Sequence, residues 1–193
     1  MIEMEINDSR SQLAAQSMGD VRDAIQRSLP EGHLVSALAV NGEPTDPEEL
    51  ERFDLRQLRS VSVHSATPQQ IARASLPETT EWIGRICGVL DGIGGEYRVG
   101  RATDATGRLV DVVDALQVLA ALLASIRDHI DIPTDARAEF EASWSESGEQ
   151  LRDCVESLCA ALAQNDPVEL ADLTGGALPQ VLGRFTSLLE GLK

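Results

Sequence analysis

The first residues of the chain alternate between apolar and charged side chains. Ile2, Met4 and Ile6 are separated by single glutamates, and this period of two is typical of a strand with one face buried. Residues 7–10 predict a turn, and a short second strand is expected around residues 12–14. The chain therefore opens with two predicted strands.

Residues 18–66 predict an alternation of helices and strands, because the apolar period changes several times within this segment. Proline and glycine mark the ends of each predicted element. We expect first a helix over residues 18–29 that stops at Pro30, and then a strand over residues 34–40 that ends at the turn Asn41-Gly42. A short helix follows, with Asp46 as its cap and Pro47 at its first position, and the last strand lies around residues 61–63.

From residue 67 onward the apolar residues recur three and four positions apart, which is the period of helices with one buried face. Four long helices are expected. The first begins at a Thr67 cap and Pro68, has a kink at Pro77 and ends at the glycines of Gly92–Gly95, and the second runs from Tyr97 to Ile130. The third begins at a Thr134 cap that follows Pro133, and the fourth at an Asp166 cap followed by Pro167. Helices joined by short turns pack most simply as an antiparallel up-and-down bundle.

The order of elements in residues 1–66 is similar to that of a β-grasp domain of the ubiquitin-like kind. The sulfur-carrier members of that superfamily end in a Gly-Gly tail whose carboxylate is activated. In this chain the last strand runs into Ser65-Ala66-Thr67-Pro68, and the pairs Gly94-Gly95 and Gly175-Gly176 are internal. The resemblance therefore implies the fold and not the carrier activity. The internal glycines suit helix ends or kinks.

The predicted fold class is α+β, with a small β-grasp-like domain over residues 1–66 and an antiparallel four-helix bundle over residues 67–193. This layout resembles bacterial two-part proteins in which a β domain precedes a helical bundle. The helical half is similar in size and layout to flagellar export chaperones, which are small acidic helical bundles. That resemblance implies a chaperone-like role, in which a helical surface holds a protein partner.

Composition narrows the range of partners. The 193 residues include 32 acidic and 16 basic side chains, which gives a formal charge of −16 at pH 7. Because contacts to phosphate supply most of the affinity for nucleic acid, a chain this acidic is not expected to bind DNA or RNA. An anionic membrane surface is disfavoured for the same reason. Aromatic residues make up only 3% of the chain, so the core must be largely aliphatic, which suits packed helices.

The N-terminal segment and the cysteines predict a cytoplasmic protein. Residues 1–30 contain acidic residues and no long apolar run, so no signal peptide is expected. No uninterrupted apolar stretch reaches the roughly 18 residues of a membrane span, since even the run Val118–Ile126 is flanked by polar residues. Cys87, Cys154 and Cys159 have no metal-like spacing, and we expect buried free thiols in a reducing compartment.

Motifs of enzyme chemistry are not found in the sequence. None of the histidines, His33, His64 and His129, has a His or Glu three or four positions away that would build a metal-binding helix face. There is no Gly-x-Ser-x-Gly motif, and Gly92-Ile93-Gly94-Gly95 departs from the Gly-x-Gly-x-x-Gly phosphate loop. The acidic residues of the helices fall at solvent-facing positions. We therefore expect no catalytic residue, no metal and no cofactor, and a protein that is not an enzyme.

Aromatic side chains often anchor protein partners, but the few in this chain fall on the apolar stripes of the helices, where core packing is the simpler explanation. Trp144 is the least clear, because its sequence neighbours are polar. Glycines and polar residues loosen the packing of two helical surfaces, and these form the candidate partner-binding site. Its residues are Phe140, Trp144, Leu151, Leu170, Leu173, Leu178 and Phe185.

The sequence leaves three functions open. The first is a non-enzymatic interaction module, an adaptor or a chaperone-like protein, that presents a helical groove to a protein partner of unknown identity. The second is a small-molecule binder or enzyme whose site lies between the two domains, where pockets often form. The third is a structural subunit that associates with itself through its helical stripes, for which a homodimer is expected as readily as a monomer.

Overall fold

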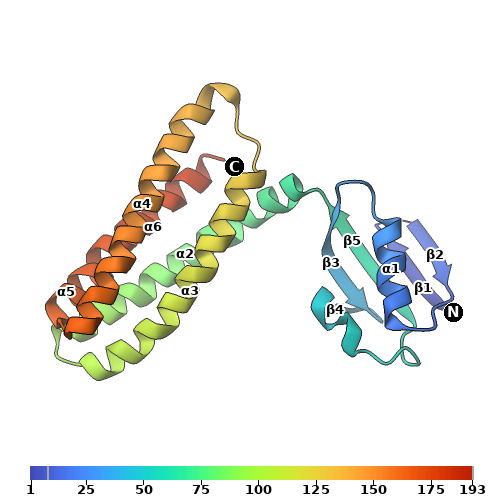
Figure 1. Ribbon diagram of the computed structural model, residues 1–193, viewed down its shortest axis with the longest axis horizontal. Coiled ribbons are helices and arrows are strands. Elements are labelled where there is room, and N and C mark those ends of the chain that lie inside the picture. The colour runs from blue at the N-terminus through green and yellow to red at the C-terminus, as the bar shows by residue number, and fades with distance from the viewer. Residues whose placement is uncertain (8, 193) are drawn as a thin grey trace. The chain divides into compact units, whose positions relative to one another are not determined.

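The computed structural model describes residues 1–7 and 9–192 and shows a mixed α+β protein, with a sheet at the N-terminus followed by helices (Figure 1). The chain divides into two compact units, one from Met1 to Ile71 and one from Ala72 onward. The sequence predicts a boundary after residue 66. The first unit also includes residues 68–71, the first turn of the following helix, which accounts for the difference.

The strand order of the sheet is β2-β1-β5-β3-β4 in the described residues. The strands are β1 (Ile2–Ile6), β2 (Ser9–Leu13), β3 (Leu34–Val40), β4 (Glu43–Thr45) and β5 (Ser60–Ala66). β1 and β5 run parallel, and the other neighbours are antiparallel. β2 begins earlier than predicted because Ser9 already pairs with Ile6. Asp8, within the predicted turn, lies outside the described residues. The short strand β4 was not predicted; it pairs with β3 across Asn41-Gly42, where both residues have positive φ.

One helix, α1 (Met18–Ser28), lies against one face of the sheet (Figure 1). A reciprocal capping box fixes its N-terminus: Ser17 Oγ accepts a hydrogen bond from the Asp20 N–H at 3.2 Å, and the Asp20 carboxylate accepts one from the Ser17 N–H at 3.0 Å. Hydrogen bonds from the backbone N–H groups of Gln16 and Ser17 lower the pKa of the Asp20 carboxyl below its ordinary value. The buried face of α1 consists of Val21, Ala24 and Ile25.

Four helix starts are predicted from capping residues, and three of these predictions are confirmed. A side chain accepts a backbone N–H of the first turn at Asp46 for the 3₁₀ helix η1 (Pro47–Arg52), at Thr67 for α2 (Pro68–Arg98) and at Asp166 for α5 (Pro167–Asp172). The prediction for Thr134 is wrong. α4 (Thr134–Gln164) already includes this residue, so Pro133 occupies the cap position and no side chain caps the helix.

The remaining helices are α3 (Ala102–His129), the π turn η2 (Leu173–Ala177) and α6 (Leu178–Glu190). The prediction that a helix ends at Gly92–Gly95 is wrong, because α2 continues to Arg98 and also passes through Pro77. Tyr97 therefore belongs to α2 and not to α3. Burial of Ile93, Gly94 and Tyr97 offsets the cost of glycine in a helix, which is about 1 kcal/mol per residue.

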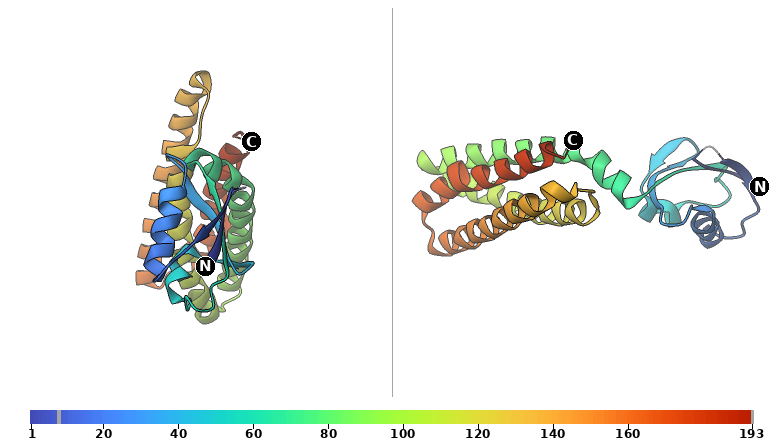
Figure 2. Two further views of the ribbon diagram at one scale, coloured as in Figure 1. Left: turned by 90° about the vertical axis from the view of Figure 1, so that its right-hand side faces the viewer. Right: turned by 90° about the horizontal axis from the view of Figure 1, so that it is seen from above.

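The core of the helical unit is aliphatic, with one aromatic cluster. α3 contributes a buried stripe whose members are alternately four and three residues apart, the spacing of helices that pack at small crossing angles. The stripe consists of Ala105, Leu109, Val112, Leu116, Leu119, Leu123 and Ile126. The Trp144 ring lies 5.2 Å from the rings of both Phe140 and Phe185. α4 and α6 lie side by side (Figure 2).

By length and composition, α3 would also suffice to cross a membrane. Its best 18-residue window has a mean hydropathy of 2.0. This window is apolar on average but is not an uninterrupted apolar run, because it includes charged residues. A helix in the core of a water-soluble protein passes the same test. The buried stripe along α3, which packs within the helical core, is the pattern of a helix that packs on other helices.

Candidate functional site

The structure places most of the predicted partner-binding residues in the core. Phe140, Trp144, Leu170, Leu173, Leu178 and Phe185 are all buried, and Leu151 alone is partly exposed. At Gly175 the packing is close, because a Cβ atom at Gly94 of α2 would lie 2.9 Å from its backbone nitrogen. These six side chains are therefore not available to a partner, and a binding surface on this unit has to be built from other residues.

An open groove between α3 and α4 includes Leu151 and is the strongest candidate site. Its volume is about 290 Å³. The lining residues are Val113, Leu116, Gln117 and Ala120 of α3 and Gly148, Leu151, Arg152, Val155 and Glu156 of α4. Helical spacing brings them together, since residues three and four apart share a face of each helix.

The groove exists because both helices carry small residues beside their buried stripes. Ala120 is exposed on α3, and Gly148 occupies the corresponding flank of α4. Ala120 ends at its Cβ atom and Gly148 has no side chain, so the apolar surfaces of Leu151 and Val155 stay partly uncovered. Leu116, which is 5% exposed, forms part of the floor. The result is an apolar channel with polar side chains only at its edges.

An ion pair ties α3 to α4 near the helix termini that the connecting loop joins. Arg127 Nη2 of α3 lies 2.6 Å from Glu141 Oε2 of α4, and Arg127 Nε donates to the same oxygen at 3.0 Å. Both side chains are partly exposed, so the pair adds little stability. Its effect is geometric, because it holds the two helices together at one end, whereas Val113 and Val155 line the groove farther along them.

The apolar surface of α3 extends beyond the groove. Val110 is 56% exposed and Val118 is 60% exposed, and Ala121 and Ala124 are exposed on the same helix. Single exposed apolar residues are ordinary on protein surfaces. Here they lie on the same helix as a groove, and exposed apolar residues near a hollow are typical of protein-binding surfaces.

Two hollows between α2 and α3 share Trp82 and Arg85 and have volumes of about 370 and 290 Å³. Their walls include several charged side chains: Glu78, Arg85, Arg108 and Asp111. Arg85 is paired with Glu81 at 3.1 Å, and Arg108 with Glu96 at 2.6 Å. Because four charged side chains line these hollows, this side of α3 is less suited to an apolar segment than the α3–α4 groove.

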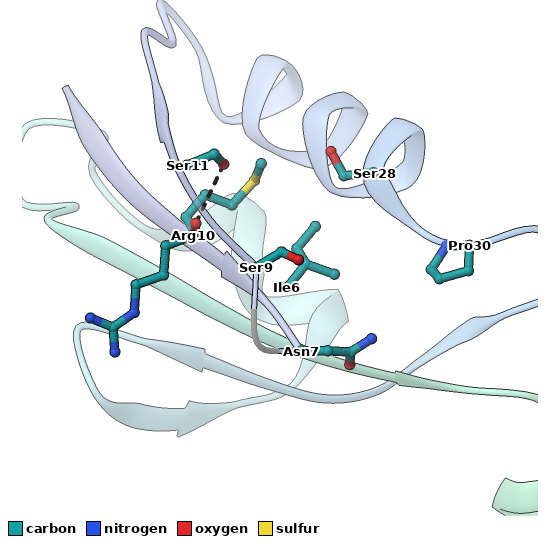
Figure 3. Close-up of a pocket in the computed structure, with 8 residues that line it drawn as sticks. Ile6, Asn7, Ser9, Arg10, Ser11, Ser28 and Pro30 are labelled. Atoms are coloured by element: carbon teal, nitrogen blue, oxygen red, sulfur yellow. Dashed lines mark hydrogen bonds between the residues drawn. The ribbon is translucent and has the colours of Figure 1, made fainter.

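A further hollow of about 290 Å³ lies in the sheet unit, between β2 and the end of α1 (Figure 3). It forms because β2 presents serines opposite the apolar residues of β1: Ser9 pairs with Ile6, and Ser11 with Met4. Ser11 Oγ donates to the Met4 carbonyl at 3.4 Å, as Figure 3 shows. The lining hydroxyls have no neighbouring acid or base within the lining set that would activate them.

The histidines lie in separate environments. His33 Nδ1 is 3.3 Å from Ser65 Oγ, and His129 Nδ1 donates to the Ser125 carbonyl at 2.8 Å. In residues 1–7 and 9–192, no three His, Cys, Asp or Glu side chains come together in a way that could hold a metal ion. The bond from His129 also fixes a ring at the end of α3, where a partial positive charge suits the helix dipole.

The three cysteines are free, but the prediction that all are buried is wrong for Cys159, which is exposed. Cys87 and Cys154 are partly buried, and burial is the main cause that raises the pKa of each thiol, with smaller contributions from Asp91 and Asp153. We expect one fast and two slow phases when the native protein reacts with a disulfide reagent near neutral pH, because the thiolate is the reacting form. The variant Cys159→Ser should lose the fast phase. A fast phase that persists in this variant would contradict the expected exposures.

The sequence contained a signal for the groove that the apolar stripes alone did not reveal. Val110, Ala120, Ala121 and Ala124 of α3 are small apolar residues on a flank where a solvent-facing helix usually carries charges. Gly148 is the matching position on α4. A search for uncharged flanks, and not only for buried stripes, would have pointed to this part of α3.

Comparisons with family models, with curated proteins and with solved structures found no match for this chain.

Proposed function

We propose that this protein is a non-enzymatic, cytoplasmic interaction module, an adaptor or a chaperone-like protein, that binds a segment of a protein partner in the α3–α4 groove. The observation that carries the proposal is the composition of this groove. Val113, Leu116, Leu151 and Val155 form an apolar channel, and Gln117, Arg152 and Glu156 stand only at its edges. Such a channel can bury apolar side chains of a bound segment.

The size and direction of the groove favour a helical segment over an extended one. The groove residues of α3, from Val113 to Ala120, span about 10 Å along the helix axis, at 1.5 Å per residue. An amphipathic helix places apolar side chains in such a groove at positions i, i+3 or i+4 and i+7. A segment that binds as an added β-strand needs an unpaired sheet edge for its backbone, whereas the α3 and α4 backbones are already hydrogen-bonded within their helices.

We also propose that the sheet unit is a β-grasp domain and that the helical unit is an antiparallel four-helix bundle. Two observations support the first part: the order β2-β1-β5-β3-β4 and the parallel pairing of β1 with β5. The second part is supported by the order of the helices. After α2, α3 and α4, the fourth helix of the bundle consists of α5, η2 and α6, which follow one another without a loop. The α3 stripe has the repeat of bundle helices.

A photo-crosslinking experiment tests the proposed function. The photoreactive residue p-benzoylphenylalanine replaces Gln117, an exposed side chain at the groove edge, in the full chain expressed in its own host. A matched variant carries it at Ala160, an exposed position of α4 that does not line the groove. We expect a discrete crosslinked protein from position 117 and none from position 160. Equal products from both positions, or none from position 117, would refute the proposed site.

A further inference from the structure

The exposed edges of the α3–α4 groove carry an excess of acidic side chains. Glu156 lines the groove. Asp114 lies one turn before Gln117 on α3, and Glu149 lies one turn before Arg152 on α4, and both acids are exposed. Arg152 is the one basic residue among the groove-lining residues. Glu141 is already neutralised by Arg127, so the remaining charge at these edges is negative.

α4, which forms one wall of the groove, is the most acidic helix of the structure. It carries seven acidic residues and two arginines between Thr134 and Gln164. The field at the groove is therefore negative over a distance longer than the contacts themselves. A field of this sign attracts positively charged partners and repels negatively charged ones.

From these charges we infer that the segment bound in the α3–α4 groove is a basic amphipathic helix, with aliphatic side chains facing Leu116, Leu151 and Val155 and with lysines or arginines along its flanks. This inference rests on the proposed function and adds the chemistry of the partner. The apolar face supplies the burial, and the flanking cations lie within reach of Asp114, Glu149 and Glu156. About three helical turns would cover the groove and Val110 beyond it.

The same charges argue against a second copy of this chain as the occupant. Any surface of a second copy that approached the groove would belong to a protein with a formal charge of −16. Like charges that face each other across an interface oppose association. In a homodimer through this groove, apolar burial would therefore have to outweigh repulsion between two acidic chains.

Four synthetic peptides of about 18 residues test the inference against the full chain by fluorescence anisotropy. Three have the same leucine stripe at helical spacing and carry lysine, glutamine or glutamate at all other positions. The fourth has the composition of the lysine peptide in scrambled order, so it has the charge without the apolar face. We expect the lysine peptide to bind about tenfold more tightly than the glutamine peptide and the glutamate peptide not to bind. The scrambled peptide should bind at least about tenfold more weakly than the lysine peptide.

Substitutions in the protein separate binding in the groove from general attraction to an acidic surface. Ala120→Tyr, which fills the groove without a change of charge, should abolish binding of the lysine peptide, whereas the matched Ala160→Tyr should leave it unchanged. Glu149→Gln and Glu156→Gln should each weaken the lysine peptide by about twofold to fivefold, and Arg152→Gln should strengthen it by a similar factor. Higher ionic strength should weaken the lysine peptide and not the glutamine peptide. Circular dichroism checks that each variant is folded.

The outcomes distinguish this inference from the proposed function. Equal affinities for the lysine, glutamine and glutamate peptides, all lost in Ala120→Tyr, would overturn the charge selection and leave the groove as a site for apolar helices. Lysine-peptide binding that survives in Ala120→Tyr would show attraction to the acidic surface outside the groove and would overturn the inference. Failure of all peptides, with no crosslink from position 117, would overturn both. Concentration-dependent self-association in sedimentation that is lost in Ala120→Tyr would identify a second copy as the occupant and would also overturn the inference.

Discussion

Replacement of Gly94 by alanine is expected to lower the free energy of unfolding of the helical unit by about 2 kcal/mol, the cost of an extra methyl group in a closely packed site. A Cβ atom at position 94 would lie 2.9 Å from the backbone nitrogen of Gly175 and 3.1 Å from the carbonyl oxygen of Ala171. These are backbone atoms of η2 and α5, so the clash can be relieved only by moving one helical segment away from α2.

The neighbouring glycine provides a matched control. A Cβ atom at Gly95 would have no heavy atom within 4 Å, and alanine is better than glycine inside a helix by about 1 kcal/mol. Gly95→Ala should therefore raise the free energy of unfolding while Gly94→Ala lowers it. At Gly175 the nearest atom would be Arg98 Nη2 at 2.9 Å, the end of a flexible side chain, so Gly175→Ala should cost less than Gly94→Ala.

Urea unfolding followed by tryptophan fluorescence measures these changes. Trp82 and Trp144 are the two tryptophans of the chain, and both lie in the helical unit, so the signal reports this unit and not the sheet unit. If Gly94→Ala and Gly95→Ala shift the urea midpoint by the same amount and in the same direction, the loss of stability in Gly94→Ala does not come from close contact between α2 and η2.

Replacement of Trp144 by alanine is expected to cost about 3 to 5 kcal/mol, the range for loss of a large aromatic side chain from a core. Trp144 is 6% exposed and packs against Phe140 at 31° and edge-on against Phe185. Ala cannot fill this space, and the cluster joins α4 to α6. A variant that unfolds at the same urea concentration as the wild type would show that Trp144 is not a core residue.

Trp82→Ala is the control for this prediction, since Trp82 is only partly buried and lines the open hollows between α2 and α3. We expect it to cost about 1 to 2 kcal/mol, because partly exposed side chains lose less burial on truncation. Each variant keeps one tryptophan as a fluorescent probe. The lysine peptide should bind folded Trp82→Ala as it binds the wild type, because Trp82 does not line the α3–α4 groove.

Local patterns were sufficient to predict most individual elements. The alternation of Ile2, Met4 and Ile6 predicted β1, and Asp46, Thr67 and Asp166 predicted three helix starts, because a cap or a period of two depends on residues that are close in the chain. The same local logic failed at Gly92–Gly95. There the glycine preference for helix ends competes with burial against residues about 80 positions away, and burial prevails.

The candidate site shows the same limit of local information. An apolar helical stripe shows which residues can be buried, but not which flank of the stripe a neighbouring helix covers. Trp144 and Phe185 fell on stripes and are covered, whereas Leu151 fell on a stripe and faces an open groove. The difference depends on the small residues Ala120 and Gly148, which lie on different helices.

Residue patterns and composition were sufficient to predict the mixture of sheet and helices, most of the helix starts, the aliphatic character of the core and the negative charge. Each follows from residues that are neighbours in the chain or from their total count. The tertiary structure decided the pairing of β1 with β5, the close approach of Gly94 to Gly175 and the exposure of the α3–α4 groove. These features depend on the distance between segments far apart in sequence, and that distance is set by side-chain packing over the whole unit.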